Sequence, residues 1–347
     1  MSSPLPIYED EPLAPLTTFG IGGAARYFAV ARAEQDVVEA LRWARERGVE
    51  LFVLGGGSNL LVRDSGFAGL VLRIEMRGLV AGDDGCVDAG AGELWDGFVD
   101  FAIARGLAGV ECLAGIPGSA GGTPVQNVGA YGQEVAEVIE SVRAYDRNAE
   151  AWVTLTQAEC RFRYRASLFN RDEPGRYIVA GVRFRLRPGG APTLKYAELQ
   201  KRFVAGMTPT LVEVAAMVRA IRHEKGMLIV AGDPDCRSAG SFFKNPIVGV
   251  DAVARIAAAL KIDAGDVPHW PTGEGTVKLP AAWLLEQAGF TKGYGAGAAG
   301  ISSRHTLALI NRGGATFADI ERLQDEIVAG VLDRFGVELE REPVVLG

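Results

Sequence analysis

Two glycine-rich stretches constrain the fold of this chain more than any other feature of its sequence. Residues 115–132 read GIPGSAGGTPVQNVGAYG, and residues 55–59 read GGGSN directly after the apolar segment Leu51 to Leu54. Glycine adopts positive φ angles and has no Cβ, so such stretches let backbone N–H groups approach a large anionic group closely. We therefore expect both stretches to bind one phosphate-bearing cofactor. Tight turns in a β-rich domain are the simpler alternative for either stretch alone.

The composition predicts a globular chain of two or three domains, because its 347 residues are 48% hydrophobic and 23% charged. A net charge of −7 argues against sequence-independent nucleic-acid binding, which needs a basic face. The N-terminal residues MSSPLPIYEDEP do not resemble an export signal, and no long apolar run predicts a membrane span, so we expect a cytoplasmic protein. We expect neither a disulfide framework nor a metal site, because these residues lack the required spacing: Cys86, Cys112, Cys160, Cys236, His223, His269 and His305.

Hydrophobic periodicity predicts a β-α-β unit near the start of the chain, with a strand over Arg26 to Ala31, a helix over Glu34 to Arg47 and a strand over Leu51 to Leu54. Its last strand ends in the GGGSN loop, where a phosphate would meet backbone N–H groups. The later elements that we expect are a helix at Leu94 to Arg105, strands at Val138 to Tyr145, Ala151 to Leu155 and Tyr177 to Leu186, and helices at Leu211 to Glu224, Asp251 to Leu260, Ala281 to Ala288 and Phe317 to Phe335. The break at Pro188-Gly189-Gly190 predicts a domain boundary.

A third glycine motif is deceptive. Gly20-Ile21-Gly22-Gly23-Ala24-Ala25 fits the GxGxxG/A pattern of dinucleotide-binding folds. That motif works only between a buried strand and a helix, and here no apolar strand precedes it and a strand follows it. We expect a turn that enters the first strand.

The chain closely resembles the UDP-N-acetylenolpyruvoylglucosamine reductase family, in its longer type with a substrate-loop tyrosine. The resemblance rests on motifs that follow one another along nearly the whole chain: Leu54 to Asn59, Ile116 to Ser119, Gln126 to Gly132, Ser238 to Pro246, Val277 to Leu279 and Trp283 to Gln287. Each motif alone is moderately specific, and the ordered set is far more specific.

The resemblance implies an α+β fold. A two-part FAD-binding domain of the vanillyl-alcohol-oxidase (PCMH) type would occupy residues 1–78 and 79–190, and an α+β substrate-binding domain residues 191–339, with residues 340–347 returning to the active site. It also implies that FAD is bound noncovalently and that NADPH reduces it. N5 of the flavin would then pass hydride to the enolpyruvyl group of the nucleotide sugar, giving UDP-N-acetylmuramate for peptidoglycan synthesis in the cytoplasm. Small molecules would be the only partners, without nucleic acid or membrane, and we expect a monomer.

Three residues carry the implied chemistry. Arg165 would clamp the substrate carboxylate, where negative charge develops; an exposed strand face formed by Arg161, Arg163 and Arg165 is the alternative. Ser241 would protonate the α-carbon, with Phe242 and Phe243 excluding water, although Gly240-Ser241 also suits a turn. Glu342 resembles the C-terminal acid of the family, which would need a raised pKa. Glu340 is the fallback, and a solvated acidic tail is the alternative.

The resemblance also implies a set of binding residues. Those for FAD are Gly55, Gly56, Gly57, Ser58, Asn59, Leu60, Pro117, Gly118, Ser119, Gly122, Gln126, Asn127, Gly129, Tyr131, Tyr164 and Arg222. Those for the nucleotide sugar are Tyr196, which resembles a tyrosine that reaches over the diphosphate, Lys225, which resembles a diphosphate-binding lysine, Asn245 and Gln287. The stretch from Lys225 to Ser241 is longer than in the best-known members, which leaves the reach of the lysine open. A solvated helix end is the alternative for Arg222 and Lys225.

Two other functions remain as alternatives. The first is another flavoenzyme of the same superfamily, such as an oxidase of a sugar lactone or hydroxy acid. Many of those attach FAD through a histidine, and this chain has no histidine before His223. The second is a regulator that binds flavin or a nucleotide sugar without catalysis, for which Arg165, Ser241 and Glu342 would not be needed together.

Overall fold

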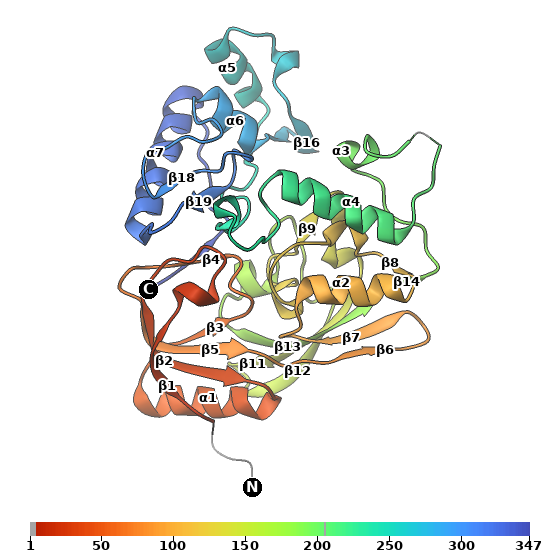
Figure 1. Cartoon of the computed structure of the whole chain (residues 1–347), viewed down its shortest axis with the longest axis vertical. Helices are drawn as coiled ribbons and strands as arrows, with labels where there is room; N and C mark the ends of the chain where they lie inside the picture. The colour runs from red at the N-terminus through yellow and green to blue at the C-terminus, as the bar shows by residue number, and fades with distance from the viewer. Residues whose placement is uncertain (1–4, 205) are drawn as a thin grey trace. The chain divides into compact units, whose positions relative to one another are not determined.

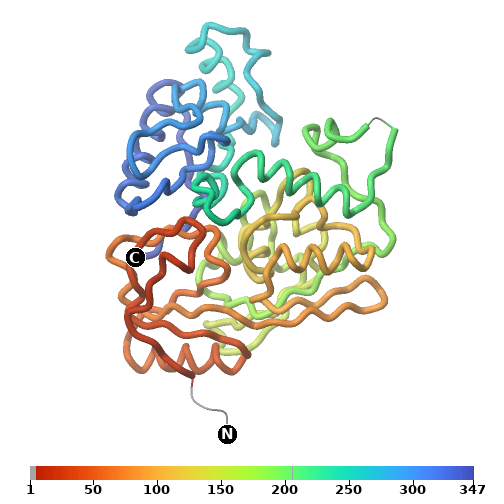
Figure 2. The backbone as a smooth tube through the Cα atoms, viewed as in Figure 1, coloured from red at the N-terminus to blue at the C-terminus, as the bar shows by residue number. Residues whose placement is uncertain are grey.

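The computed structural model describes residues 5–204 and 206–347, so the first four residues of the N-terminal segment and residue 205 lie outside the description. The described residues group into two units, and the chain passes between them several times (Figure 2). Unit 1 contains residues 5–11, 25–57 and 68–223, and unit 2 contains residues 12–24, 58–67 and 224–347. The three-part division at residues 78 and 190 stays a prediction.

The strands are β1 (Tyr8–Pro12), β2 (Ala24–Ala31), β3 (Leu51–Leu54), β4 (Leu60–Val62), β5 (Phe67–Ile74), β6 (Leu79–Ala81), β7 (Cys86–Gly90), β8 (Leu107–Ala108), β9 (Gly129–Ala130), β10 (Gln133–Glu134), β11 (Ile139–Asp146), β12 (Ala151–Thr156), β13 (Tyr177–Arg185), β14 (Arg187–Pro188), β15 (Ile247–Gly249), β16 (Trp270–Gly273), β17 (Thr276–Lys278), β18 (Ala299–Ile301), β19 (Leu309–Asn311) and β20 (Val344–Leu346). The α-helices are α1 (Glu34–Arg47), α2 (Trp95–Ala104), α3 (Ala197–Gln200), α4 (Leu211–Glu224), α5 (Asp251–Leu260), α6 (Ala281–Gln287) and α7 (Phe317–Phe335).

The first sheet of unit 1 has the strand order β1-β2-β5-β3, and β3 pairs in parallel with β5. Helix α1 connects β2 to β3 and lies along one face of this sheet (Figure 1). It buries Val37, Ala40 and Ala44, and it ends at Gly48, whose left-handed backbone closes the last turn. The predicted β-α-β unit is thus present, and β5 lies between its two strands.

The second sheet of unit 1 is antiparallel, with the order β12-β11-β13-β7-β6. Helix α2 packs against it through aromatic rings: the ring centroids of Phe98 and Phe184 are 4.5 Å apart, and those of Trp95 and Phe184 are 5.8 Å apart. All three side chains are almost fully buried. Burying a side chain of this size contributes about 1.5–3 kcal/mol, so this contact fixes the end of α2 from which the long glycine loop is held.

Unit 2 combines helices α5, α6 and α7 with short strands in the sheets β15-β17-β16, β18-β19 and β20-β4. Its core joins the three helices through Ile256, Leu284, Ile320 and Ile327, all of which are fully buried. The chain end belongs to this unit, because β20 pairs in parallel with β4, with Val344 opposite Leu60.

Most predicted elements are confirmed, several of them to the residue, as for Glu34–Arg47, Leu211–Glu224 and Phe317–Phe335. The elements that periodicity predicts after Pro188 are all helices, and residues 224–347 also contain six short strands: β15, β16, β17, β18, β19 and β20. Strands of three or four residues are too short to show a two-residue period. The Gly20–Ala25 motif leads into β2 and not into a helix, which confirms that it lacks the strand-turn-helix setting.

Candidate active site

The two predicted glycine loops are in contact within unit 1. A Cβ atom on Gly56 would lie 2.5 Å from the Cα atom of Gly118 and 2.9 Å from the backbone nitrogen of Ser119, closer than real Cβ atoms approach. A Cβ atom on Gly55 would lie 3.1 Å from the Oγ atom of Ser119. The two loops therefore meet backbone to backbone, which only glycine permits at residue 56.

The long glycine loop is held at its start from two helices. The N–H group of Gly115 donates to the Asp96 carboxylate of α2 over 2.6 Å, and the Nε of Arg222 in α4 donates to the Gly115 carbonyl over 2.9 Å. Gly115 has a φ of 71°, so its conformation suits glycine. Arg219 bridges Asp96 and Asp100 at 2.7 and 2.6 Å and so links α4 to α2. Asp96 and Arg219 had no signal in the sequence, because each is an ordinary charged residue on a helix.

Three of the predicted site residues have positive φ angles without being glycine: Asn127 at 47°, Tyr131 at 47° and Arg165 at 53°. Such backbone conformations cost free energy and persist only where the surroundings enforce them. For Asn127 these surroundings are known. Its amide donates to Glu134 at 2.7 Å and to the Arg163 carbonyl at 3.2 Å, and its carbonyl accepts from the N–H of Ala136. The buried side chain of Asn127 therefore holds the loop together.

Arg165 lies in a turn and not on a strand, so the reading of Arg161, Arg163 and Arg165 as one exposed strand face is wrong. Arg163 and Ala166 form the bridge that closes this turn. Arg161 and Arg163 form ion pairs with Asp172, whereas Arg165 donates from Nη2 to the Gly129 carbonyl over 2.9 Å. The Arg165 side chain therefore reaches the long glycine loop, whereas Arg161 and Arg163 pair with Asp172.

Tyr131 connects the glycine loop to Arg222 and to Tyr196. The Arg222 guanidinium forms a hydrogen bond with the Tyr131 hydroxyl, and only 6% of Arg222 is exposed. Burial raises the pKa of Tyr131 to about 12, and burial lowers the pKa of Arg222. The ring of Tyr196 meets that of Tyr131 edge to face with centroids 5.5 Å apart. The solvated helix end proposed as an alternative for Arg222 is therefore wrong.

Unit 2 brings Ser241 and Glu342 onto adjacent segments. Phe243 and Arg341 form an antiparallel bridge, the N–H of Glu342 donates to the Phe242 carbonyl over 2.9 Å, and the N–H of Lys244 donates to the Glu340 carbonyl. Phe242 and Phe243 are at most 1% exposed, so they anchor this segment in the core. Ser241, at the edge of that core, is half-buried.

The two candidate acids at the C-terminus differ in their surroundings. Glu340 is exposed and forms an ion pair with Lys244 over 2.7 Å. Glu342 is half-buried, and its carbonyl accepts a hydrogen bond from the Asn59 side chain over 3.3 Å. The N–H of Val344 donates to the Asn59 carbonyl, so the predicted cofactor residues Ser58, Asn59 and Leu60 adjoin the C-terminal segment within unit 2.

The remaining predicted substrate residues of unit 2 are Lys225, Asn245 and Gln287. Asn245 accepts the first N–H of α6, from Ala281, over 2.9 Å, and thereby ties the Ser241 segment to that helix. Gln287 is the last residue of α6, and Lys225 follows α4. All three side chains are half-buried.

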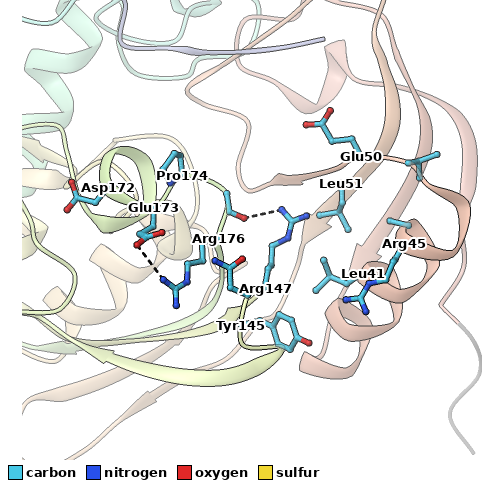
Figure 3. Close-up of a pocket in the computed structure, with 14 residues that line it drawn as sticks. Leu41, Arg45, Glu50, Leu51, Tyr145, Arg147, Asp172, Glu173, Pro174 and Arg176 are labelled. Carbon is cyan, nitrogen blue, oxygen red and sulfur yellow. Dashed lines mark hydrogen bonds and ion pairs between the residues drawn. The ribbon is translucent and has the colours of Figure 1, made fainter.

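A separate hollow of about 580 Å³ lies in unit 1 beside the end of α1 (Figure 3). Its arginines are engaged: Arg147 donates to the Gly175 carbonyl, Arg176 pairs with Asp146 and Glu173, and Arg45 pairs with Glu150. It contains none of the predicted site residues. We therefore do not place the active site there.

Comparison with known proteins identifies the family. A UDP-N-acetylenolpyruvoylglucosamine reductase of Streptomyces avermitilis is 48% identical to this chain. The alignment covers 97% of this chain and 94% of that relative. The corresponding protein of Thermobifida fusca is 45% identical, over 97% of each chain. The chain belongs to the UDP-N-acetylenolpyruvoylglucosamine reductase family. Residues 233–346 match the family described as the C-terminal domain of this reductase.

The cofactor domain is identified separately, because residues 25–154 match a family described as an FAD binding domain. The crystal structure of a UDP-N-acetylenolpyruvylglucosamine reductase from Thermus caldophilus aligns with a TM-score of 0.69 and 26% identity, over 99% of this chain and 100% of that one. The fold is thus α+β, with an FAD-binding part and a C-terminal α+β part, and FAD is the cofactor.

The residues of unit 1 fit such a cofactor. The two glycine loops meet backbone to backbone at Gly56 and Gly118, and backbone N–H groups in loops without side chains can bind a diphosphate. In the same unit, Arg222, which donates to the Gly115 carbonyl of the long loop, provides a buried cation, and Tyr131 provides a hydroxyl. These are the groups that a reductase of this family would use to hold a flavin dinucleotide.

Proposed function

We propose that this chain reduces the enolpyruvyl group of UDP-N-acetylenolpyruvoylglucosamine to give UDP-N-acetylmuramate for peptidoglycan synthesis. One observation carries the proposal: a relative named for this reductase activity is 48% identical and aligned with 97% of the chain. Bound FAD supplies the hydride-transfer chemistry, with NADPH as the reductant. Neither alternative function, another flavin oxidoreductase or a non-catalytic regulator, is favoured by these relatives.

Ser241 holds the proton for the α-carbon of the substrate. A serine hydroxyl is a weak acid, so it can serve only if it is fixed in place and if nearby donors stabilise the alkoxide that it leaves. The fixed position is supported by the neighbouring Phe242, whose N–H donates to the Leu307 carbonyl over 2.8 Å and whose ring is fully buried. Gly240, with a φ of 73°, provides the turn before the serine.

Arg165 and Glu342 orient the substrate carboxylate and the developing charge beside it. A guanidinium offers two parallel hydrogen bonds to a carboxylate, and Arg165 is already oriented by its bond to the Gly129 carbonyl. Glu342 is favoured over Glu340, because Glu340 is exposed and paired with Lys244. The nucleotide and diphosphate are bound by Tyr196, Lys225, Asn245 and Gln287.

The protein acts in the cytoplasm as a monomer on small molecules, without nucleic acid or membrane partners. The net charge of −7 supports the lack of nucleic-acid partners. Among residues 5–204 and 206–347, no helix is both long and apolar enough to cross a bilayer.

The proposed function is tested by separating the two half-reactions without oxygen. The purified protein should be yellow, NADPH should bleach it, and the enolpyruvyl nucleotide sugar should restore the colour while UDP-N-acetylmuramate appears. A colourless protein that takes up no FAD, or a bleached protein that only oxygen recolours, would contradict the proposal. In the latter case an oxidase of the same fold would become the better assignment.

A further inference from the structure

The stretch between Lys225 and Ser241 folds around one arginine. Arg304, from a distant part of unit 2, forms an ion pair with Asp233, and its Nε donates to Asp235 over 3.0 Å. Asp235 also accepts the N–H and hydroxyl of Ser303 at 3.1 and 2.6 Å. We call Asp233, Asp235, Ser303 and Arg304 the Arg304 cluster.

The cluster is well shielded for a group of charges. The exposed fractions of the side chains are 27% for Arg304, 20% for Asp233 and 11% for Asp235. Hydrogen bonding to Arg304 lowers the pKa of Asp233. Burial by itself would raise the pKa of Asp235, but hydrogen bonds from Ser303 and Arg304 lower it. Partly buried pairs of this geometry are stronger than exposed surface pairs, and removing one partner leaves the other unpaired.

One side of the cluster supports the residue after Lys225. Gly226 has a φ of 64°, and a Cβ atom there would lie 3.0 Å from the Cβ of Asp235 and 3.2 Å from the Nε of Arg304. The chain that leaves Lys225 therefore packs directly on the cluster, and a side chain at residue 226 would have to displace its neighbours. The contacts of Gly226 with the cluster therefore restrict the backbone position of Lys225, the residue before it.

The other side of the cluster supports the segment that carries Ser241. The turn after Arg304 reaches Leu307, whose carbonyl accepts the N–H of Phe242 over 2.8 Å. The Ser302 hydroxyl accepts the N–H of Arg304 and so holds this turn in shape. The same segment is also held three residues before Ser241, where the Thr18 hydroxyl donates to the Ser238 carbonyl over 2.6 Å.

We propose that Arg304 is a positioning residue of this reductase, which closes residues 226–240 into a loop that fixes the backbone of Lys225 relative to Ser241. Arg304 acts through these two residues, so the inference rests on their proposed roles toward the diphosphate and the reacting carbon. A loop held in this way lets a long connection place a diphosphate-binding cation and a proton donor as accurately as a short one would. Ordering this loop before substrate binds also lowers the entropic cost of binding.

The test compares Arg304→Met with Arg322→Met in the flavin-loaded enzyme. Arg322 is a matched control, because it is an arginine of unit 2 that forms one exposed ion pair, with Asp319. For Arg304→Met we expect bleaching by NADPH to stay within about twofold, the KM for the nucleotide sugar to rise roughly tenfold, and recolouring by substrate to slow roughly tenfold. Both half-reactions should be unchanged in Arg322→Met. Equal loss in both half-reactions of Arg304→Met would overturn the proposal.

A double-mutant cycle with Lys225→Ala distinguishes positioning from general destabilisation. If Arg304 acts by placing Lys225, the double variant should have nearly the KM of Lys225→Ala alone. Additive effects, with about tenfold further loss in the double variant, would overturn the proposal. If Arg304→Met does not fold, Arg304→Lys and Asp233→Asn keep part of the cluster and should show the same pattern with smaller changes; full activity in both would also overturn it.

Amide hydrogen exchange separates a failure of this inference from a failure of the proposed function. Exchange in residues 226–240 should become at least about tenfold faster in Arg304→Met and stay unchanged in Arg322→Met, whatever reaction the protein catalyses. Unchanged exchange would reject the role of Arg304 while leaving the reductase assignment intact. Faster exchange in a protein that never recolours with the nucleotide sugar would reject the function and retain the role of Arg304 in ordering the loop.

Discussion

The two units hold their candidate site residues by different interactions. In unit 1 the two cofactor loops meet backbone to backbone, with Gly56 so close to Gly118 that no side chain fits between them, and the side chains of Asn127 and Arg222 hold the long loop. In unit 2 the Ser241 segment is held by buried rings and by charges, as Phe242, Phe243 and the Arg304 cluster show. A site made of close-packed backbone has little freedom to change. A site held by side chains can be altered one interaction at a time, and the variants below test this difference.

Ser241→Ala should give the largest effect, and in one half-reaction only. Loss of a positioned proton donor costs about 10²–10⁴-fold in rate. We expect recolouring by the nucleotide sugar to slow by that factor, while bleaching by NADPH is unaffected, because the groups that we propose to hold FAD are in unit 1 and in residues 58–60. Single-turnover absorbance measurements check both steps. Similar losses in the two steps would remove Ser241 from the chemistry.

The two C-terminal acids should differ clearly. Glu342→Gln is expected to slow recolouring by roughly tenfold to a hundredfold, since it removes the carboxyl group that we propose to act beside the reacting carbon. Glu340→Gln is the matched control and should change the rate less than about twofold, because it breaks only an exposed pair with Lys244. The reverse order of effects, measured by the same absorbance change, would assign the acid to Glu340.

Gly56→Ala should damage unit 1 and leave unit 2 intact. The new Cβ would lie 2.5 Å from the Cα of Gly118, so the two loops must separate. We expect a loss of about 1–3 kcal/mol in the free energy of unfolding and loss of the yellow colour on purification. Gly97→Ala, inside helix α2, is the control: its Cβ meets only ordinary contacts, and alanine should stabilise the helix by about 0.5–1 kcal/mol. Retention of FAD by Gly56→Ala would argue against the proposal that these two glycine loops hold FAD.

The smallest effect concerns an ion pair of unit 1 outside the glycine loops. Hydrogen bonding to Arg176 lowers the pKa of Asp146 to about 2. Because the pKa of Asp146 is depressed in the folded state, the stabilisation is complete above pH 4 or so and is lost as the pH falls toward 2. Arg176→Met should lower the free energy of unfolding by about 1 kcal/mol at neutral pH, with FAD retained. In urea titrations at a series of pH values, it should also weaken the fall in stability between about pH 4 and pH 2.

Arg45→Met is the control for that titration, because its pair with Glu150 is more than half exposed on both sides. It should change the free energy of unfolding by less than about 0.5 kcal/mol at any pH. If stability falls between about pH 4 and pH 2 as steeply in Arg176→Met as in the unchanged protein, Asp146 does not contribute to stability in this way.

Local sequence patterns predicted the elements well where the elements are long. The apolar spacing in Phe317–Phe335, with Thr316 as its cap, is sufficient to mark that helix. The short strands of unit 2 were missed, because three residues show no period. For the site, the residue types and the two glycine loops were predictable. The sequence did not show whether the side chains of Asn127 and Asn245 bind a ligand or other parts of the protein, and in the structure both form hydrogen bonds with protein groups.

The sequence by itself determined the family, the cofactor and the residue types of the site, because these depend on which groups stand in which order along the chain. Only the tertiary structure decided which residues meet: Gly56 with Gly118, Glu342 with the Ser241 segment, and Arg304 with Asp233 and Asp235. These contacts join parts of the chain far apart in sequence. The free energy of such a contact depends on packing and solvent exclusion in three dimensions, for which a local pattern carries no signal.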